Sequence, residues 1–202
     1  MMRLIRPALT LLPAALLGAC ALLSTPDPVQ LYRFGGDPAA GRSQPLSSPI
    51  QITLRPVELP EASEGDRVLG VTGGEAAYIK GARWVSPAKD LFTAAVENAF
   101  ATEAQRVRLL GGRELTPASR TLDLDVRAFE ARYDAPGAAP TVVVTVHAVM
   151  LRLPERTIAA ERTFSVSHPA GENRVSAIVA AFDAATRDVN GQIVAWTDSM
   201  AG

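Results

Sequence analysis

The chain has 202 residues and a formal net charge of −1, with 20 Lys and Arg against 21 Asp and Glu. This balance, with no block of like charges, excludes a typical nucleic-acid-binding or polybasic membrane-surface protein. Because Cys20 is the only cysteine, no disulfide can form within the chain, and packing in one domain of this length must supply the stability.

The first 20 residues have the pattern of a lipoprotein signal peptide. Two arginines form a short cationic start, an apolar run follows, and the small residues Gly18 and Ala19 precede Cys20. We therefore expect residues 1–19 to be removed and Cys20 to become the lipid-modified first residue. Its thiolate would be alkylated by a lipid donor, and two or three acyl chains together hold a soluble domain stably on a membrane.

Two other interpretations of this segment are open. Residues 4–23 could form an uncleaved transmembrane helix, although Pro7, Pro13 and Gly18 interrupt the apolar run and leave it short for about 20 spanning residues. An ordinary secretory signal followed by an incidental cysteine is the other alternative.

Residues 20–49 are rich in Pro, Gly, Ser and Ala, a composition typical of an extended or disordered tether. Within this segment, residues 31–34 (Leu-Tyr-Arg-Phe) alternate briefly in polarity and suggest an edge strand. A single folded domain is expected over residues 50–202.

Several short strands are predicted in the first half of this domain. Residues 50–54 alternate between apolar and polar side chains, as in a half-buried strand. Residues 67–71 and 75–79 predict a hairpin, because the intervening residues 72–74 (Thr-Gly-Gly) include glycines that can adopt positive φ. Residues 107–110 form a short apolar strand before a glycine turn.

Two segments have the apolar spacing of amphipathic helices. In residues 86–105, apolar side chains recur at i, i+3, i+4, i+7 and i+8 from Phe92, with Ser86 as the expected N-cap and Pro87 at the first helical position. Residues 173–197 repeat the helical spacing over a longer stretch. Both helices should cover the apolar face of a sheet.

Three strands are predicted in succession over residues 122–128, 141–153 and 157–166. No helical segment separates them, which favours antiparallel neighbours. The sequence therefore predicts an α+β fold: a mainly antiparallel sheet of about five to seven strands with two long amphipathic helices packed on one face.

Residues that could support catalysis or metal binding are sparse. His147 and His168 are the only histidines, they lack the spacing of paired metal ligands, and no G-x-S-x-G motif supplies a nucleophile. Asp123 and Asp125 resemble an acidic metal-binding pair, but the alternation of their strand predicts a solvated face. We expect no metal, no cofactor and no enzymatic activity.

One aromatic and basic segment stands out. Tyr78, Arg83 and Trp84 lie just before the first long helix. Large aromatic residues in a domain with few of them usually pack in the core. Tyr, Trp and Arg also dominate protein interfaces, so these three residues are candidates for a partner-binding surface. Both interpretations are open from the sequence alone.

Several segments, in a fixed order, resemble those of one known family. They are the lipoprotein signal, residues 55–60 (Arg-Pro-Val-Glu-Leu-Pro) after an early strand, residues 78–84 leading into a helix, residues 128–130 (Ala-Phe-Glu), and residues 180–183 (Ala-Ala-Phe-Asp) in the closing helix. In order and spacing the chain resembles the ABC-type transport auxiliary lipoproteins over residues 31–196.

This resemblance implies a non-enzymatic docking component of an MCE-type transporter that moves lipids or other hydrophobic molecules between the inner and outer membranes. The implied partners are an MCE-domain protein, the permease and ATPase of an ABC transporter, and the membrane through Cys20; further copies of the chain are another possible partner. Ala21 stands where an aspartate would signal inner-membrane retention, which implies the outer membrane. A periplasmic shuttle that holds an acyl chain between helices and sheet is the alternative function.

Overall fold

The computed structural model describes residues 29–36, 47–111 and 114–200. Cys20 and the predicted signal peptide lie outside these residues. The strands are β1 (Gln30–Tyr32), β2 (Ile50–Leu54), β3 (Arg67–Thr72), β4 (Glu75–Trp84), β5 (Val107–Leu109), β6 (Arg120–Tyr133), β7 (Thr141–Arg152) and β8 (Thr157–Pro169). The helices are α1 (Glu61–Glu64), α2 (Ala88–Glu103) and α3 (Val175–Ser199).

Strand β6 organises a mixed sheet. On one side it pairs antiparallel with β7, which pairs antiparallel with β8. Its other side is shared by two parallel neighbours: β2 pairs with its first residues, and β3 pairs with residues 131–133 at its end. Strand β4 then pairs antiparallel with β3, whereas β1 and β5 are added in parallel to β4 and β2.

The prediction of an α+β fold is confirmed, whereas the prediction of a mainly antiparallel sheet of about five to seven strands fits only in part, because four of the strand pairings are parallel. The described part of the chain has eight strands in one mixed sheet. Alternating polarity reports which face of a strand is buried and carries no information on the direction of its neighbour. Strands β2 and β3 both reach β6 after intervening elements rather than by a hairpin, and they arrive in parallel.

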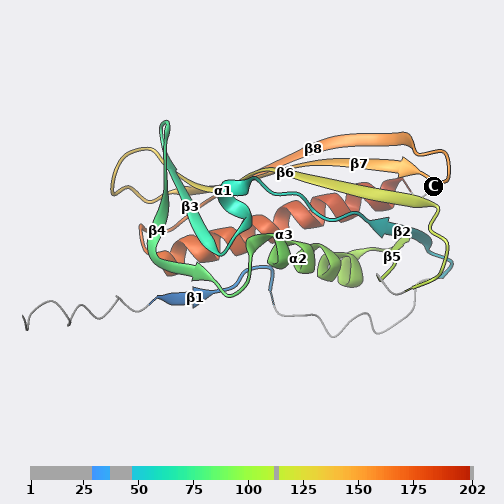
Figure 1. Ribbon diagram of the computed structural model, residues 1–202, viewed down its shortest axis with the longest axis horizontal. Helices are drawn as coiled ribbons and strands as arrows, with labels where there is room; N and C mark the ends of the chain where they lie inside the picture. Colours follow the sequence, from blue (N-terminus) through green and yellow to red (C-terminus); the bar gives the residue numbers. More distant parts are fainter. Residues whose placement is uncertain (1–28, 37–46, 112–113, 201–202) are drawn as a thin grey trace, which may run out of the picture.

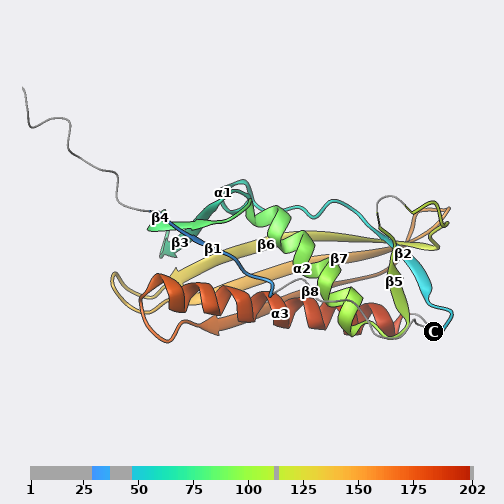
Figure 2. The same ribbon diagram turned by 90° about the horizontal axis from the view of Figure 1, so that it is seen from below.

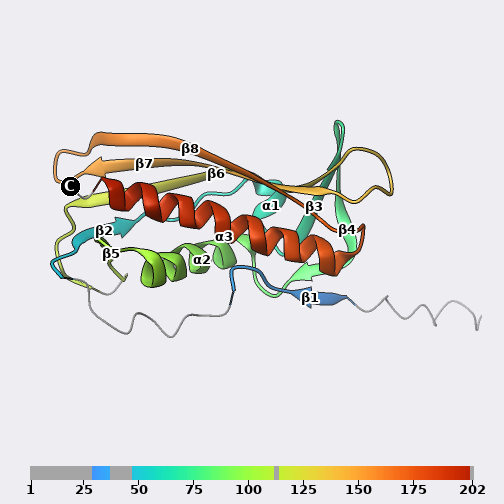
Figure 3. The ribbon, with the colours of Figure 1, turned by 180° about the vertical axis from the view of Figure 1, so that it is seen from behind.

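Helices α2 and α3 lie side by side on the same side of strands β6–β8 (Figures 2 and 3). Helix α3 packs on β7 and β8 and also contacts α2. The predicted apolar stripes are buried, as the 0% exposure of Phe92, Phe182 and Ile193 shows. The predicted cap is wrong: Pro87 occupies the N-cap position of α2 and no side chain caps it.

An aromatic cluster fills the core where β1, β4, β6 and both long helices meet. It consists of Phe34, Trp84, Phe92, Phe129 and Phe182, whose contacting ring centroids are 4.8–6.4 Å apart. Phe34 is buried although the sequence places it in the tether. Residues 30–36, including the edge strand suggested by the sequence, are therefore a structural part of the domain.

Asp183 of α3 holds the segment that follows Phe34. The backbone N–H groups of Gly35 and Gly36 donate hydrogen bonds to its Oδ1 at 2.9 and 3.2 Å. Arg187, one turn further along α3, forms an ion pair with the same carboxylate. Gly35 has φ +87° and lies against α2: a Cβ atom at this position would be 2.6 Å from the Cβ of Ala95.

Two neighbouring glycines permit a matched test of this packing. Gly36 has φ +73° but no atom near its missing Cβ, so Gly36→Ala should cost only the left-handed strain of about 1–2 kcal/mol. We expect Gly35→Ala to be more destabilising by roughly 1–3 kcal/mol, because it also overpacks α2. Urea unfolding measures both, and equal losses would contradict the close contact with Ala95.

Candidate functional site

Trp84, the largest residue of the predicted partner-binding set, lies in the core. Its side chain is 2% exposed and makes an edge-to-face contact with Phe34 at 4.9 Å and with Phe182 at 5.4 Å between ring centroids. Its backbone N–H donates to the carbonyl of Asp66 and thereby joins the end of β4 to the start of β3. Of the two roles that the sequence left open for Trp84, the structure shows packing in the core.

Tyr78 and Arg83 lie on the opposite, solvent-facing side of the hairpin. The guanidinium carbon of Arg67 stands 3.6 Å from the centroid of the Tyr78 ring, a cation–π stack across the two strands. Arg83 donates to Asp66 at 2.6 Å, with both side chains nearly half exposed. Water screens an ion pair of this kind, so it adds little to stability. The hairpin brings Tyr78 and Arg83 to one surface and excludes Trp84 from it.

Strand β1 extends this surface with apolar side chains. Its parallel register sets Leu31 opposite Arg83 and Tyr32 opposite Trp84, so Leu31 points to solvent and Tyr32 to the core. Leu31 is 61% exposed, and Val29, two residues earlier, is 50% exposed. Val85, which follows β4 and donates its N–H to the Tyr32 carbonyl, is 49% exposed.

We call this surface the outer face; it comprises Val29, Leu31, Arg67, Tyr78, Arg83 and Val85. Its apolar half could not be recognised from the sequence, because residues 29 and 31 fall in a Pro-rich and Gly-rich segment. The alternation of residues 31–34 is the only signal that could have located it. The register with β4 is needed to show that Leu31 lies beside Arg83.

The outer face lies at one end of the elongated domain. Strands β1, β3 and β4 gather at this end, whereas β2 and β5 lie at the opposite end, near the turn between β7 and β8 (Figure 1). The described chain begins at Val29, within the outer face. The predicted tether therefore enters the domain at this end.

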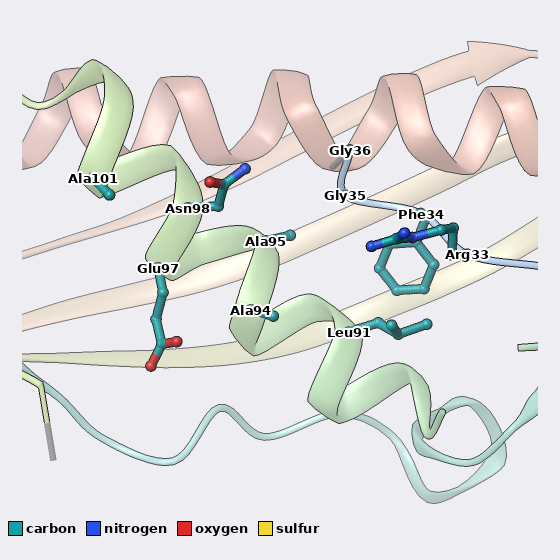
Figure 4. A pocket seen from close by; sticks show the side chains of 10 residues that line it. All are labelled: Arg33, Phe34, Gly35, Gly36, Leu91, Ala94, Ala95, Glu97, Asn98 and Ala101. Carbon is teal, nitrogen blue, oxygen red and sulfur yellow. The ribbon is translucent and has the colours of Figure 1, made fainter. Parts of the chain in front are cut away.

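A shallow groove of about 350 Å³ runs between α2 and the segment that follows β1 (Figure 4). Its volume is at the lower limit for small-molecule sites. The described residues that line it are Arg33, Phe34, Gly35, Gly36, Leu91, Ala94, Ala95, Glu97, Asn98 and Ala101. None of these belongs to β6, β7, β8 or α3, so the groove is not a space between the helices and the sheet.

Both histidines lie in surface contacts. His168 is 3.1 Å from Asp188 on α3, and the pKa of that carboxyl is lowered by hydrogen bonds from Gln192 and from His168. His147 contacts the Thr163 hydroxyl at 3.2 Å. Within residues 29–36, 47–111 and 114–200, no three His, Cys, Asp or Glu side chains gather as a metal-binding group.

The two aspartates of β6, Asp123 and Asp125, also form surface contacts. Asp123 pairs with Arg55 at 2.6 Å, and Asp125 pairs with Arg127 at 3.3 Å on the same strand. This is the solvated strand face that the alternation predicts. Among the helices that the structure describes, none combines the length and apolar character required to cross a bilayer.

The order of elements and the lipoprotein signal point to one family, and a comparison with family models decides it. The model for the ABC-type transport auxiliary lipoprotein component matches residues 32–194. The chain belongs to this family. The match begins at the last residue of β1 and ends within α3, so it includes the groove, the aromatic cluster and the outer-face residues of β3 and β4, but not Val29 and Leu31. No curated protein sequence matches the chain at a significant level.

Solved structures share the fold of this auxiliary lipoprotein. A protein of Xanthomonas campestris is 25% identical, with a TM-score of 0.71 over 85% of this chain and 96% of that one. An uncharacterized protein is 15% identical, with a TM-score of 0.63 over 84% and 99% of the two chains. A Chlamydia trachomatis protein, 9% identical, has a TM-score of 0.52 over 76% and 98%. The last two similarities concern the fold alone.

Proposed function

We propose that this auxiliary lipoprotein is a non-enzymatic docking component of an MCE-type ABC transporter that moves lipids or other hydrophobic molecules between the inner and outer membranes. Cys20 carries the lipid anchor, and the domain stands on the periplasmic side of the outer membrane. The family match over residues 32–194 carries this proposal. The lipoprotein signal that ends at Cys20 supports the anchor.

Two features support a role without catalysis. The two histidines and the paired aspartates of β6 are engaged in exposed contacts rather than in a cleft. The groove is small and open, and much of its wall is glycine and alanine. A chain with this inventory is better suited to hold a partner than to transform a substrate.

Capture of the transporter tests the proposal. The tagged, lipidated protein is purified from detergent-solubilised envelopes of a strain that produces the transporter, with an unrelated tagged outer-membrane lipoprotein as control. We expect the MCE-domain protein, the permease and the ATPase in the sample and not in the control. Recovery of none of them from a strain that produces all three would refute the docking role.

The same capture examines Tyr78 and Arg83 as partner-binding residues. Both side chains are exposed, so Tyr78→Ala and Arg83→Ala should leave the fold intact. If either variant loses the transporter components, the partner contacts this end of the domain. If both variants retain them, the partner docks on another surface.

A further inference from the structure

We infer that the outer face rests on the anionic phospholipid surface of the membrane that holds the anchor. In this arrangement Val29, Leu31 and Val85 enter the interfacial layer, and Arg67 meets lipid phosphates. The inference deepens the proposed function and depends on its lipid anchor at Cys20. In this arrangement the outer face contacts the lipid bilayer, and the protein partner binds another surface of the domain.

The side chains of the outer face match the chemistry of a membrane interface. Three aliphatic residues, each about half exposed or more, lie together with an exposed tyrosine and two arginines. Aliphatic side chains gain from burial at the boundary between headgroups and acyl chains, and tyrosine is enriched there because its ring is amphipathic. Arginine can bury its stem in this layer while its charge stays with the headgroups.

The electrostatics favour an anionic surface. Asp66 neutralises Arg83 at 2.6 Å. Arg67 stacks on Tyr78 and forms no salt bridge with any described residue, so its charge is available to lipid phosphates. One net charge gives a modest attraction that falls with ionic strength. Contact is therefore expected to depend on both the aliphatic residues and the charge.

Because the anchor lies close to the outer face, a weak contact is sufficient to keep this face on the membrane. Eight residues separate Cys20 from Val29, so even a fully extended chain keeps Val29 within about 30 Å of the anchor. A short tether holds the outer face near the lipid at an effective concentration of roughly millimolar. A surface that would not bind vesicles by itself can then remain on the membrane for much of the time.

This contact would set the orientation of the domain. The outer face lies at the end that contains β1, β3 and β4, and the long strands and α3 extend from it toward the β2–β5 end (Figures 1 and 3). With the outer face on the membrane, the β2–β5 end points into the periplasm. That end is then the part of the domain that an incoming transporter meets first.

Depth-dependent quenching in vesicles tests the inference. Leu31→Cys and Ile158→Cys each introduce one thiol, at positions that are 61% and 60% exposed. Leu31 belongs to β1 and Ile158 to the start of β8, at opposite ends of the domain (Figure 1). Each thiol is labelled with an environment-sensitive fluorophore on the full-length lipidated protein, whose own cysteine is blocked by lipid. The protein is reconstituted in vesicles of phosphatidylethanolamine and phosphatidylglycerol that contain a brominated lipid as quencher.

We expect loss of fluorescence at position 31 and none at position 158. Adding Arg67→Glu, or replacing phosphatidylglycerol with phosphatidylcholine, should reduce the quenching at position 31. Arg152→Glu, at an exposed position near the other end of the sheet, should leave it unchanged.

Three results would overturn the inference. If the protein floats with the vesicles but both positions are quenched equally, the result supports the lipid anchor and contradicts the contact of the outer face with the membrane. If the protein does not float with the vesicles, the result also contradicts the lipid anchor, on which the contact depends. If the fluorescence of the label at position 31 changes only when solubilised transporter components are added, the outer face binds the protein partner instead of the membrane.

Discussion

Replacing Trp84 with alanine is expected to destabilise the protein by about 3–5 kcal/mol, the usual range for truncating a buried aromatic side chain. The indole contacts Phe34 in the segment after β1, Phe129 of β6 and Phe182 of α3. Its loss leaves a cavity where β1, β6 and α3 meet, and the rigid sheet limits how far that cavity can close. The midpoint of urea unfolding measures the effect.

Tyr78→Ala is the matched control on the same strand. Its ring is 38% exposed and stacks on Arg67, so its removal should cost at most about 1 kcal/mol of cation–π energy. A loss for Trp84→Ala as small as that for Tyr78→Ala would contradict the packing role of Trp84. Because Trp84→Ala weakens the whole core, a loss of transporter capture by this variant alone would say nothing about an interface.

Cys20→Ser is expected to abolish outer-membrane fractionation. Serine offers no thiolate for the lipid donor, so the anchor is not attached and the signal should stay uncleaved. Fractionation of envelopes and the mass of the protein measure both consequences. Ala21→Asp is the matched control, because it keeps the thiol and changes only the sorting residue; we expect a cleaved, lipidated protein in the inner membrane.

The same variant separates the three interpretations of the signal segment. An uncleaved transmembrane helix predicts that Cys20→Ser changes neither mass nor fractionation. An ordinary secretory signal predicts normal cleavage and a released protein with or without the thiol. Normal outer-membrane fractionation of Cys20→Ser would refute lipid attachment at this residue.

Much of the fold could be predicted because long periodic segments carry a strong signal. The helices predicted over residues 86–105 and 173–197 correspond to α2 and α3 to within about two residues. The alternation of residues 122–128 located the middle of β6, and the strand predicted over residues 141–153 corresponds to β7. Each of these elements is stabilised mainly by the burial of the apolar side chains on one face, and the spacing of those side chains can be recognised in the sequence.

The remaining features depend on contacts between distant residues. The parallel pairing of β2 and β3 with opposite ends of β6 is set by the path of the chain and not by any local pattern. Strand β1 has only three residues and is held by β4, Asp183 and the aromatic cluster rather than by its own propensity. Core packing of Trp84 was one of the two interpretations that the sequence left open, and the structure decides it. The exposure of Leu31 beside Arg83 could not be predicted, because it depends on the register between β1 and β4.

The hydrogen bonds from Gly35 and Gly36 to Asp183 also define how the domain bears mechanical load. Tension on an anchor at Cys20 would act first on the three residue pairs between β1 and β4. It would then reach the Asp183 carboxylate, which belongs to the longest helix of the described chain. A force between membrane and transporter would thus be transmitted into the N-terminal half of α3 and the sheet beneath it, and the tether could not be detached without disturbing the core.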